Sequence, residues 1–124
     1  MTKKLPFILF LMFAMGLFAQ TVNTETIDWS FNSTPSATGN SNASRTIEIG
    51  DTVTWNWYAS GAHNVKSNAS ATETFQSNYF GNGGTFSYTF TSVGVNDYVC
   101  TPHPVTMFGT ITVVAEGALS TSEA

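Results

Sequence analysis

Apolar and polar residues alternate along much of the chain, which is the two-residue period of a β-strand. In the segment Thr52–Trp57, the side chains of Val53, Trp55 and Trp57 fall on one face and polar side chains on the other. The same alternation predicts strands at residues 26–31, 46–49, 85–90 and 110–113. Turn-forming pairs such as Gly50-Asp51 separate these short segments, so the pattern predicts an all-β sandwich.

Other segments lack this alternation. Residues 32–44 are rich in Ser, Asn, Gly and Pro, and we interpret them as a surface loop. Residues 59–80 have weak periodicity and allow a strand only around residues 63–66. We expect the aromatic residues of the alternating segments to pack in the core rather than to bind a ligand; they are Trp29, Trp55, Trp57, Phe86, Tyr88 and Phe90.

The N-terminal segment has the composition of a signal peptide. Lys3 and Lys4 precede an apolar run at residues 5–18, and Ala19 before polar Gln20 offers a cleavage point. The run is shorter than the roughly 20 residues of a membrane-spanning helix. We therefore expect residues 1–19 to be removed and the mature protein to be periplasmic or secreted, without a membrane span. An uncleaved N-terminal anchor is the alternative.

The rest of the chain fits one domain at residues 20–114, followed by a linker-like tail at residues 115–124. Cleavage would remove Lys3 and Lys4 and so change the net charge of −4 by two units to −6. Only Arg45 and Lys66 would then face eight acidic residues, which argues against nucleic acid as a partner. The single cysteine of this exported domain can form no internal disulfide, so it requires another explanation.

Four residues offer that explanation. Cys100, His103 and Met107 lie within eight residues, and His63 lies upstream, so the chain's only cysteine and only two histidines can serve one site. Two imidazoles, a thiolate and a weakly bound thioether are the ligands of blue-copper electron-transfer centres. Side chains alternate between the two faces of a strand, so Cys100 and Met107 can lie on the same side of two neighbouring strands. A tight loop between these strands then brings both to a common centre. The sequence therefore predicts one type 1 copper ion bound by these four residues.

The motif Cys100-Thr101-Pro102-His103-Pro104, with Met107 and with His63-Asn64-Val65, resembles the copper motif of plastocyanins, pseudoazurins and amicyanins. This resemblance to the cupredoxins implies a Greek-key β-sandwich of the cupredoxin type and a carrier of single electrons. The Cys-x2-His-x3-Met spacing is longer than that of amicyanin and shorter than that of plastocyanin. A weaker or different axial contact in place of Met107 is therefore an open alternative.

The resemblance also implies how the site works. Asn64 would tie the first ligand segment to the cysteine loop, and electrons would leave through the edge of His103. An apolar patch around that edge would dock redox partner proteins transiently, with the protein acting as a monomer; the patch comprises Pro102, Pro104, Val105 and Phe108.

Two other functions compete with electron transfer. A copper storage or delivery protein would release the metal readily, and a structural or adhesive module would carry a vestigial site that fails to bind copper. We expect no enzymatic activity, because four ligands fill the coordination shell and no further histidine or carboxylate pair offers an open metal position or an acid-base pair.

Overall fold

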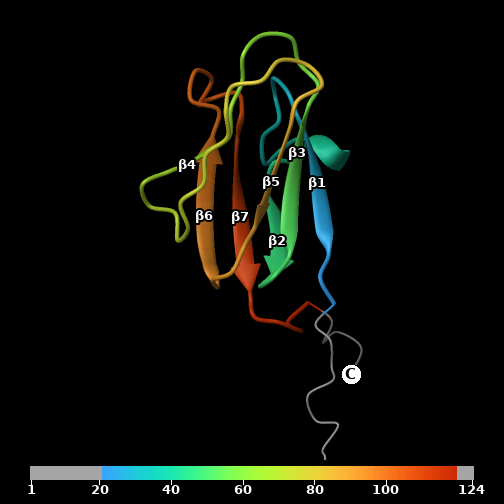
Figure 1. Cartoon of the computed structure of the whole chain (residues 1–124), viewed down its shortest axis with the longest axis vertical. Helices are drawn as coiled ribbons and strands as arrows, with labels where there is room; N and C mark the ends of the chain where they lie inside the picture. The colour runs from blue at the N-terminus through green and yellow to red at the C-terminus, as the bar shows by residue number, and fades with distance from the viewer. Residues whose placement is uncertain (1–20, 120–124) are drawn as a thin grey trace, which may run out of the picture.

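The computed structural model describes residues 21–119, which form two β-sheets that face each other (Figure 1). The first sheet has the strand order β1 (Thr24–Trp29), β3 (Thr52–Trp57), β5 (Thr85–Thr89). The second has the order β2 (Arg45–Glu48), β7 (Phe108–Val114), β6 (Gly94–Val99), β4 (Lys66–Ser67). A 3-10 turn, η1, covers Gly39–Ser41. The predicted signal peptide lies outside the described residues.

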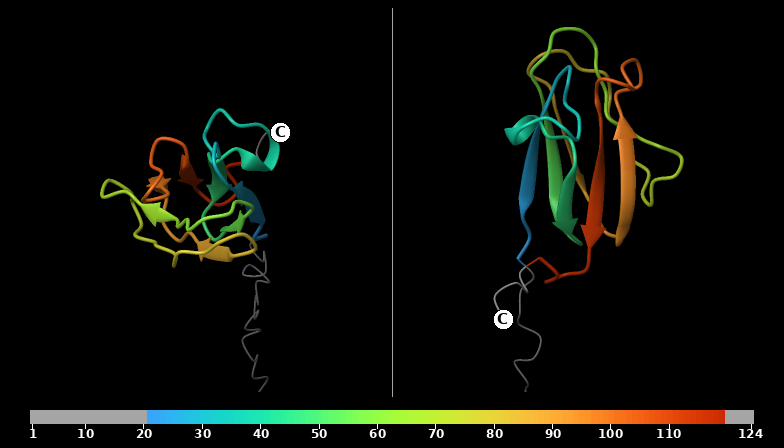
Figure 2. Two further views of the ribbon diagram at one scale, coloured as in Figure 1. Left: turned by 90° about the horizontal axis from the view of Figure 1, so that it is seen from above. Right: turned by 180° about the vertical axis from the view of Figure 1, so that it is seen from behind.

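The pairing of the strands brings the functional loops to one end of the sandwich. Strands β1 and β3 run parallel, as do β2 and β7, and the remaining pairs are antiparallel. The loops that follow β1, β3 and β6 consequently lie together at the end opposite the first residues of β1 (Figures 1 and 2). No helix in the described part of the chain is long and apolar enough to cross a membrane.

The core lies between the two sheets and is rich in aromatic side chains. Tyr98 of the second sheet packs against Trp29 and Trp55 of the first, with ring centroids 5.3 and 5.2 Å apart. The predicted core residues are confirmed, because Trp29, Trp55, Trp57 and Phe90 are buried and Phe86 and Tyr88 pack partly buried against them. The inward and outward faces of β3 also follow the predicted alternation.

Strand β1 begins and ends two residues earlier than the predicted segment 26–31. The reason is a turn centred on Ser33, whose hydroxyl oxygen accepts a hydrogen bond from the Ser30 amide (2.9 Å) and donates one to the Asp28 carbonyl (2.6 Å). These side-chain bonds compete with continued strand pairing and turn the chain away from the sheet.

The segment 32–44 is more than a surface loop, because Ser33 and Ala43 within it are completely buried. The Tyr98 hydroxyl donates a hydrogen bond of 2.6 Å to the Ala43 carbonyl. Gly109 of β7 lies so close to Ala43 that a Cβ atom on Gly109 would collide with the Ala43 backbone. The segment is therefore packed tightly against the second sheet.

Two further segments differ from their predicted descriptions. The strand expected around residues 63–66 is reduced to a bridge between His63 and Phe80, followed by the short strand β4. The first part of the predicted tail is tied to the domain, because the Glu48 carboxylate accepts hydrogen bonds from the amides of Gly117 (2.7 Å) and Leu119 (3.0 Å).

Candidate metal centre

Two tryptophan side chains hold the segment that carries His63 by hydrogen bonds. The Trp57 indole donates a hydrogen bond of 2.8 Å to the His63 carbonyl, and the Trp29 indole donates one of 3.0 Å to the Asn64 carbonyl. On its other side, His63 exchanges two backbone hydrogen bonds with Phe80. These contacts fix a stretch of chain that has little regular structure of its own.

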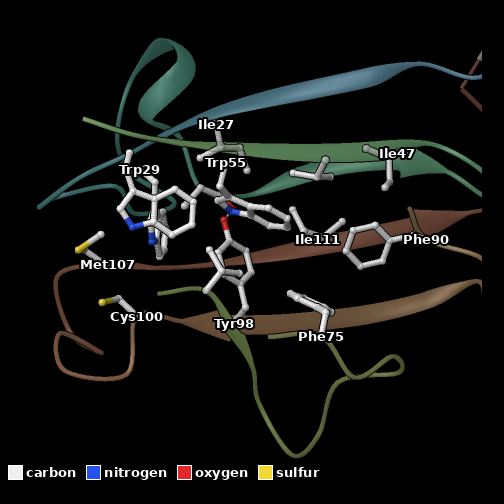
Figure 3. Packing of buried hydrophobic residues seen from close by; sticks show 14 of the residues in the cluster. Ile27, Trp29, Ile47, Trp55, Phe75, Phe90, Tyr98, Cys100, Met107 and Ile111 are labelled. Carbon is white, nitrogen blue, oxygen red and sulfur yellow. The ribbon is translucent and has the colours of Figure 1, made fainter. Parts of the chain in front are cut away.

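The cysteine loop joins β6 to β7 and is closed by its own backbone. The Cys100 amide donates to the Met107 carbonyl (2.9 Å), and the His103 carbonyl accepts from the Met107 amide (2.9 Å). Cys100 and Met107 are completely buried. Their sulfur atoms lie at the same end of the core, next to Trp29 (Figure 3). The tight loop predicted from strand parity is present.

Asn64 joins the two segments. Its side-chain oxygen accepts a hydrogen bond from the Thr101 amide (2.7 Å), and its side-chain nitrogen donates one to the Thr101 hydroxyl (3.0 Å). The predicted tie between the first ligand segment and the cysteine loop is therefore confirmed. Asn64 is completely buried and Thr101 is exposed, so the two bonds join the core to the surface loop.

Three of the four predicted ligands converge on one point. The Nδ1 atoms of His63 and His103 are 3.1 Å apart, and the Cys100 Sγ atom lies 3.7 and 3.5 Å from them. A point equidistant from the three atoms is about 2.0 Å from each, close to the roughly 2.0 Å of a metal-imidazole bond and somewhat short of the roughly 2.3 Å of a metal-thiolate bond. The donor atoms thus fit a trigonal metal ion of this size.

The hydrogen bonding of His63 leaves Nδ1, the nitrogen that faces Cys100 and His103, free to bind a metal. Its Nε2 atom lies 3.0 Å from the Ser60 carbonyl oxygen, which can only accept, so Nε2 carries the proton. Nδ1 therefore presents its lone pair toward Cys100. A carbonyl that fixes the tautomer of a histidine in this way is typical of metal ligands.

The buried environment of Cys100 disfavours its thiolate form unless a positive ion lies beside it. Burial raises the pKa of the Cys100 thiol, and backbone hydrogen bonds from Asn64 and His103 oppose this rise only in part. A thiolate in this place is consequently unfavourable without a compensating charge. A bound metal ion supplies that charge and releases the thiol proton.

The structure also adds contacts that the sequence did not reveal. The Phe31 ring lies against both imidazoles, although the sequence pattern assigned Phe31 to a strand. The indole donors of Trp29 and Trp57 and the Ser60 carbonyl were also missed. The only signal for Phe31 was an aromatic residue at the end of an alternating segment, directly before a turn-rich loop.

Comparison with known proteins identifies the family to which the chain belongs. Residues 39–114 match the family model of copper binding proteins of the plastocyanin/azurin family. This match spans more than half of the chain and includes the three converging donors and Met107. The chain therefore belongs to the plastocyanin/azurin family of copper-binding proteins, and copper is its cofactor.

Individual relatives agree with this assignment. The chain is 43% identical over 70 residues to a halocyanin from Natronomonas pharaonis, an alignment that covers 54% of this chain and 43% of that protein. The chain thus matches less than half the length of this curated relative. A purple cupredoxin from Nitrosopumilus maritimus is 28% identical with a TM-score of 0.57, covering 74% of this chain and 99% of the other.

An amicyanin variant in its Cu(I) form is 26% identical with a TM-score of 0.55 and covers 82% of this chain and 90% of the other. The predicted all-β sandwich of the cupredoxin type, the predicted family resemblance and the predicted copper cofactor are all confirmed.

Proposed function

We propose that this protein is an exported blue-copper protein that carries single electrons between redox partners. His63, Cys100 and His103 are its three strong ligands, and Met107 is its weak axial ligand. The observation that carries this proposal is the convergence of two Nδ1 atoms and one Sγ atom within 3.7 Å of one another at the buried end of the core. Copper bound there would gain and lose one electron between Cu(I) and Cu(II).

The rigidity of the ligand segments favours electron transfer over copper storage or delivery. The indole donors and the paired bonds between Asn64 and Thr101 fasten both segments to the rest of the fold. Ligands held this way need little rearrangement when the oxidation state changes. Rapid delivery of copper would instead require a site that opens easily, as a site held by few contacts would.

The exposure of the two histidines supports a route for the electron. His63 is completely buried, whereas His103 is only half-buried, so His103 is the ligand nearer to solvent. Pro102, Pro104 and Val105 around it are exposed, with Val105 at 80%. Such an apolar surface suits brief docking of a partner protein. Phe108, the fourth residue of the expected patch, is half-buried in β7.

The remaining parts of the proposal concern context. We propose that the chain is exported after removal of residues 1–19 and acts as a monomer. We also propose that it has no catalytic activity, because a complete four-ligand shell leaves no position for a substrate.

Repeated redox cycling in the presence of a copper chelator tests the proposed function against storage or delivery. An electron carrier is expected to bleach on reduction and regain its colour on oxidation over many cycles, while the chelator removes copper far more slowly. Loss of copper to the chelator on the timescale of the redox reaction would contradict electron transfer and support storage or delivery.

A further inference from the structure

Phe31 makes an unusual contact with the site. Its ring centroid is 4.8 Å from that of His63 and 4.7 Å from that of His103, with interplanar angles of 88° and 76°. The two imidazole centroids are themselves 4.8 Å apart. Edge-to-face contact is a favoured arrangement of aromatic rings. The three rings therefore form one compact group, with Phe31 on the outside, 47% exposed.

The backbone around Phe31 holds the ring in this place. The Asn32 amide donates a hydrogen bond of 2.8 Å to the Thr106 carbonyl, and the Phe108 amide donates one of 3.1 Å to the Ser33 carbonyl. Asn32 adopts a φ of 70°, a left-handed conformation that asparagine tolerates better than most residues. The turn that carries Phe31 is thus fastened to both ends of the segment 106–108, directly beside the ligands.

We propose that Phe31 is a positioning residue that covers the metal centre, limits the access of water to it and favours its reduced state. This inference rests on the proposed function. With two neutral imidazoles and one thiolate, uptake of one electron from a partner lowers the net charge of the centre from +1 to zero. An apolar cover disfavours the charged oxidised form relative to the neutral reduced form. The apolar surroundings of a metal site control its solvent access and its potential.

The variants Phe31→Ala and Phe31→Leu test this role, with Val95→Ala as the matched control. Val95 has a similar exposure, 52%, and lies in β6. We expect Phe31→Ala to shift the reduction equilibrium with a fixed mediator toward the oxidised form by about threefold or more and to lose copper to a chelator about tenfold faster. Phe31→Leu keeps part of the apolar cover and should fall between Phe31→Ala and the wild type, and Val95→Ala should match the wild type.

A second measurement needs no copper. In the metal-free protein, the His63 Nε2 proton is buried and bonded to Ser60, so NMR should show slow exchange of this proton with water. Exchange should be faster in Phe31→Leu than in the wild type and fastest in Phe31→Ala. Should Phe31→Ala not fold, the comparison of Phe31→Leu with the wild type decides the matter.

Unchanged proton exchange, copper loss and potential in the Phe31 variants would overturn the inference. This result differs from failure of the proposed function, in which the wild type itself would form no blue copper centre. It would also leave the ligand assignment of His63 and His103 untouched.

Discussion

Asn64 and Thr101 are joined by two hydrogen bonds across the site, one of 2.7 Å to the Thr101 amide and one of 3.0 Å to its hydroxyl. The two residues follow directly after His63 and Cys100, so the bonds link the two ligand segments at neighbouring positions. Their distance in the sequence is 37 residues. Hydrogen bonds within the fold therefore help to hold the two segments at the site in position.

Substitutions at this pair should show graded effects. Asn64→Ala removes both bonds and leaves the Thr101 amide without its partner, which should lower the free energy of unfolding of the metal-free protein by about 2 kcal/mol. Thr101→Val removes only the bond to the hydroxyl and should cost about 1 kcal/mol. Urea unfolding followed by tryptophan fluorescence measures both values. Equal stability of all three proteins would show that the pair does not hold the segments together.

The tryptophans offer a matched comparison. Trp57 and Trp29 donate hydrogen bonds to the His63 and Asn64 carbonyls, whereas buried Trp55 makes no bond to this segment and its indole nitrogen has no well-aligned acceptor within residues 21–119. All three substitutions by phenylalanine remove a similar volume from the core. Trp57→Phe and Trp29→Phe should therefore destabilise the protein by about 1 kcal/mol more than Trp55→Phe does.

The same three variants should differ in copper retention. Copper loss to a chelator should be faster in Trp57→Phe and Trp29→Phe than in Trp55→Phe, because only the first two loosen the His63 segment. If Trp55→Phe were as damaging as the other two in both measurements, the indole hydrogen bonds would have no specific role.

Met107→Leu distinguishes an axial ligand from a core residue. The exchange conserves volume, so the fold should lose less than about 1.5 kcal/mol of stability. Because the three strong donors remain, the protein should stay blue. Loss of the thioether donor should disfavour Cu(II) and raise the reduction potential measured by spectroelectrochemistry. An unchanged potential and an unchanged electron paramagnetic resonance spectrum would assign Met107 to packing alone.

Association with partners should depend little on salt once the ionic strength exceeds about 0.1 M. Aspartate, glutamate, lysine and arginine are absent from residues 29–44, 57–65 and 98–115, which include the loops that follow β1, β3 and β6 at the site end. Charges remote from a docking surface are screened beyond about 10 Å at 0.1 M salt. Electron self-exchange, measured by NMR line broadening, should therefore change little when the ionic strength is raised above about 0.1 M. A steep dependence would place charged side chains in the docking surface.

The sequence predicted the parts of this fold and site that depend on local pattern. The alternation of Val53, Trp55 and Trp57 identified β3 with its observed bounds, and the short cysteine motif identified the closed loop from Cys100 to Met107. The turn at Ser33 was missed because it depends on a side chain competing with the sheet.

The contacts of Phe31 could not be predicted for a related reason. They join residues that are distant in the sequence, and a single sequence considered on its own carries no sign of such proximity. The indole bonds from Trp29 and Trp57 to the ligand segment have the same origin. Local pattern thus identified which residues could bind copper, and the tertiary structure identified what holds and covers them.

The most direct test is the visible absorption and electron paramagnetic resonance of the Cu(II)-loaded mature protein beside Cys100→Ser. The account predicts an intense blue band from thiolate to copper in the wild type, which disappears in Cys100→Ser although the fold is retained. A colourless or weakly coloured complex in the wild type, or a blue band that survives the substitution, would contradict the assignment of a blue-copper centre to His63, Cys100 and His103.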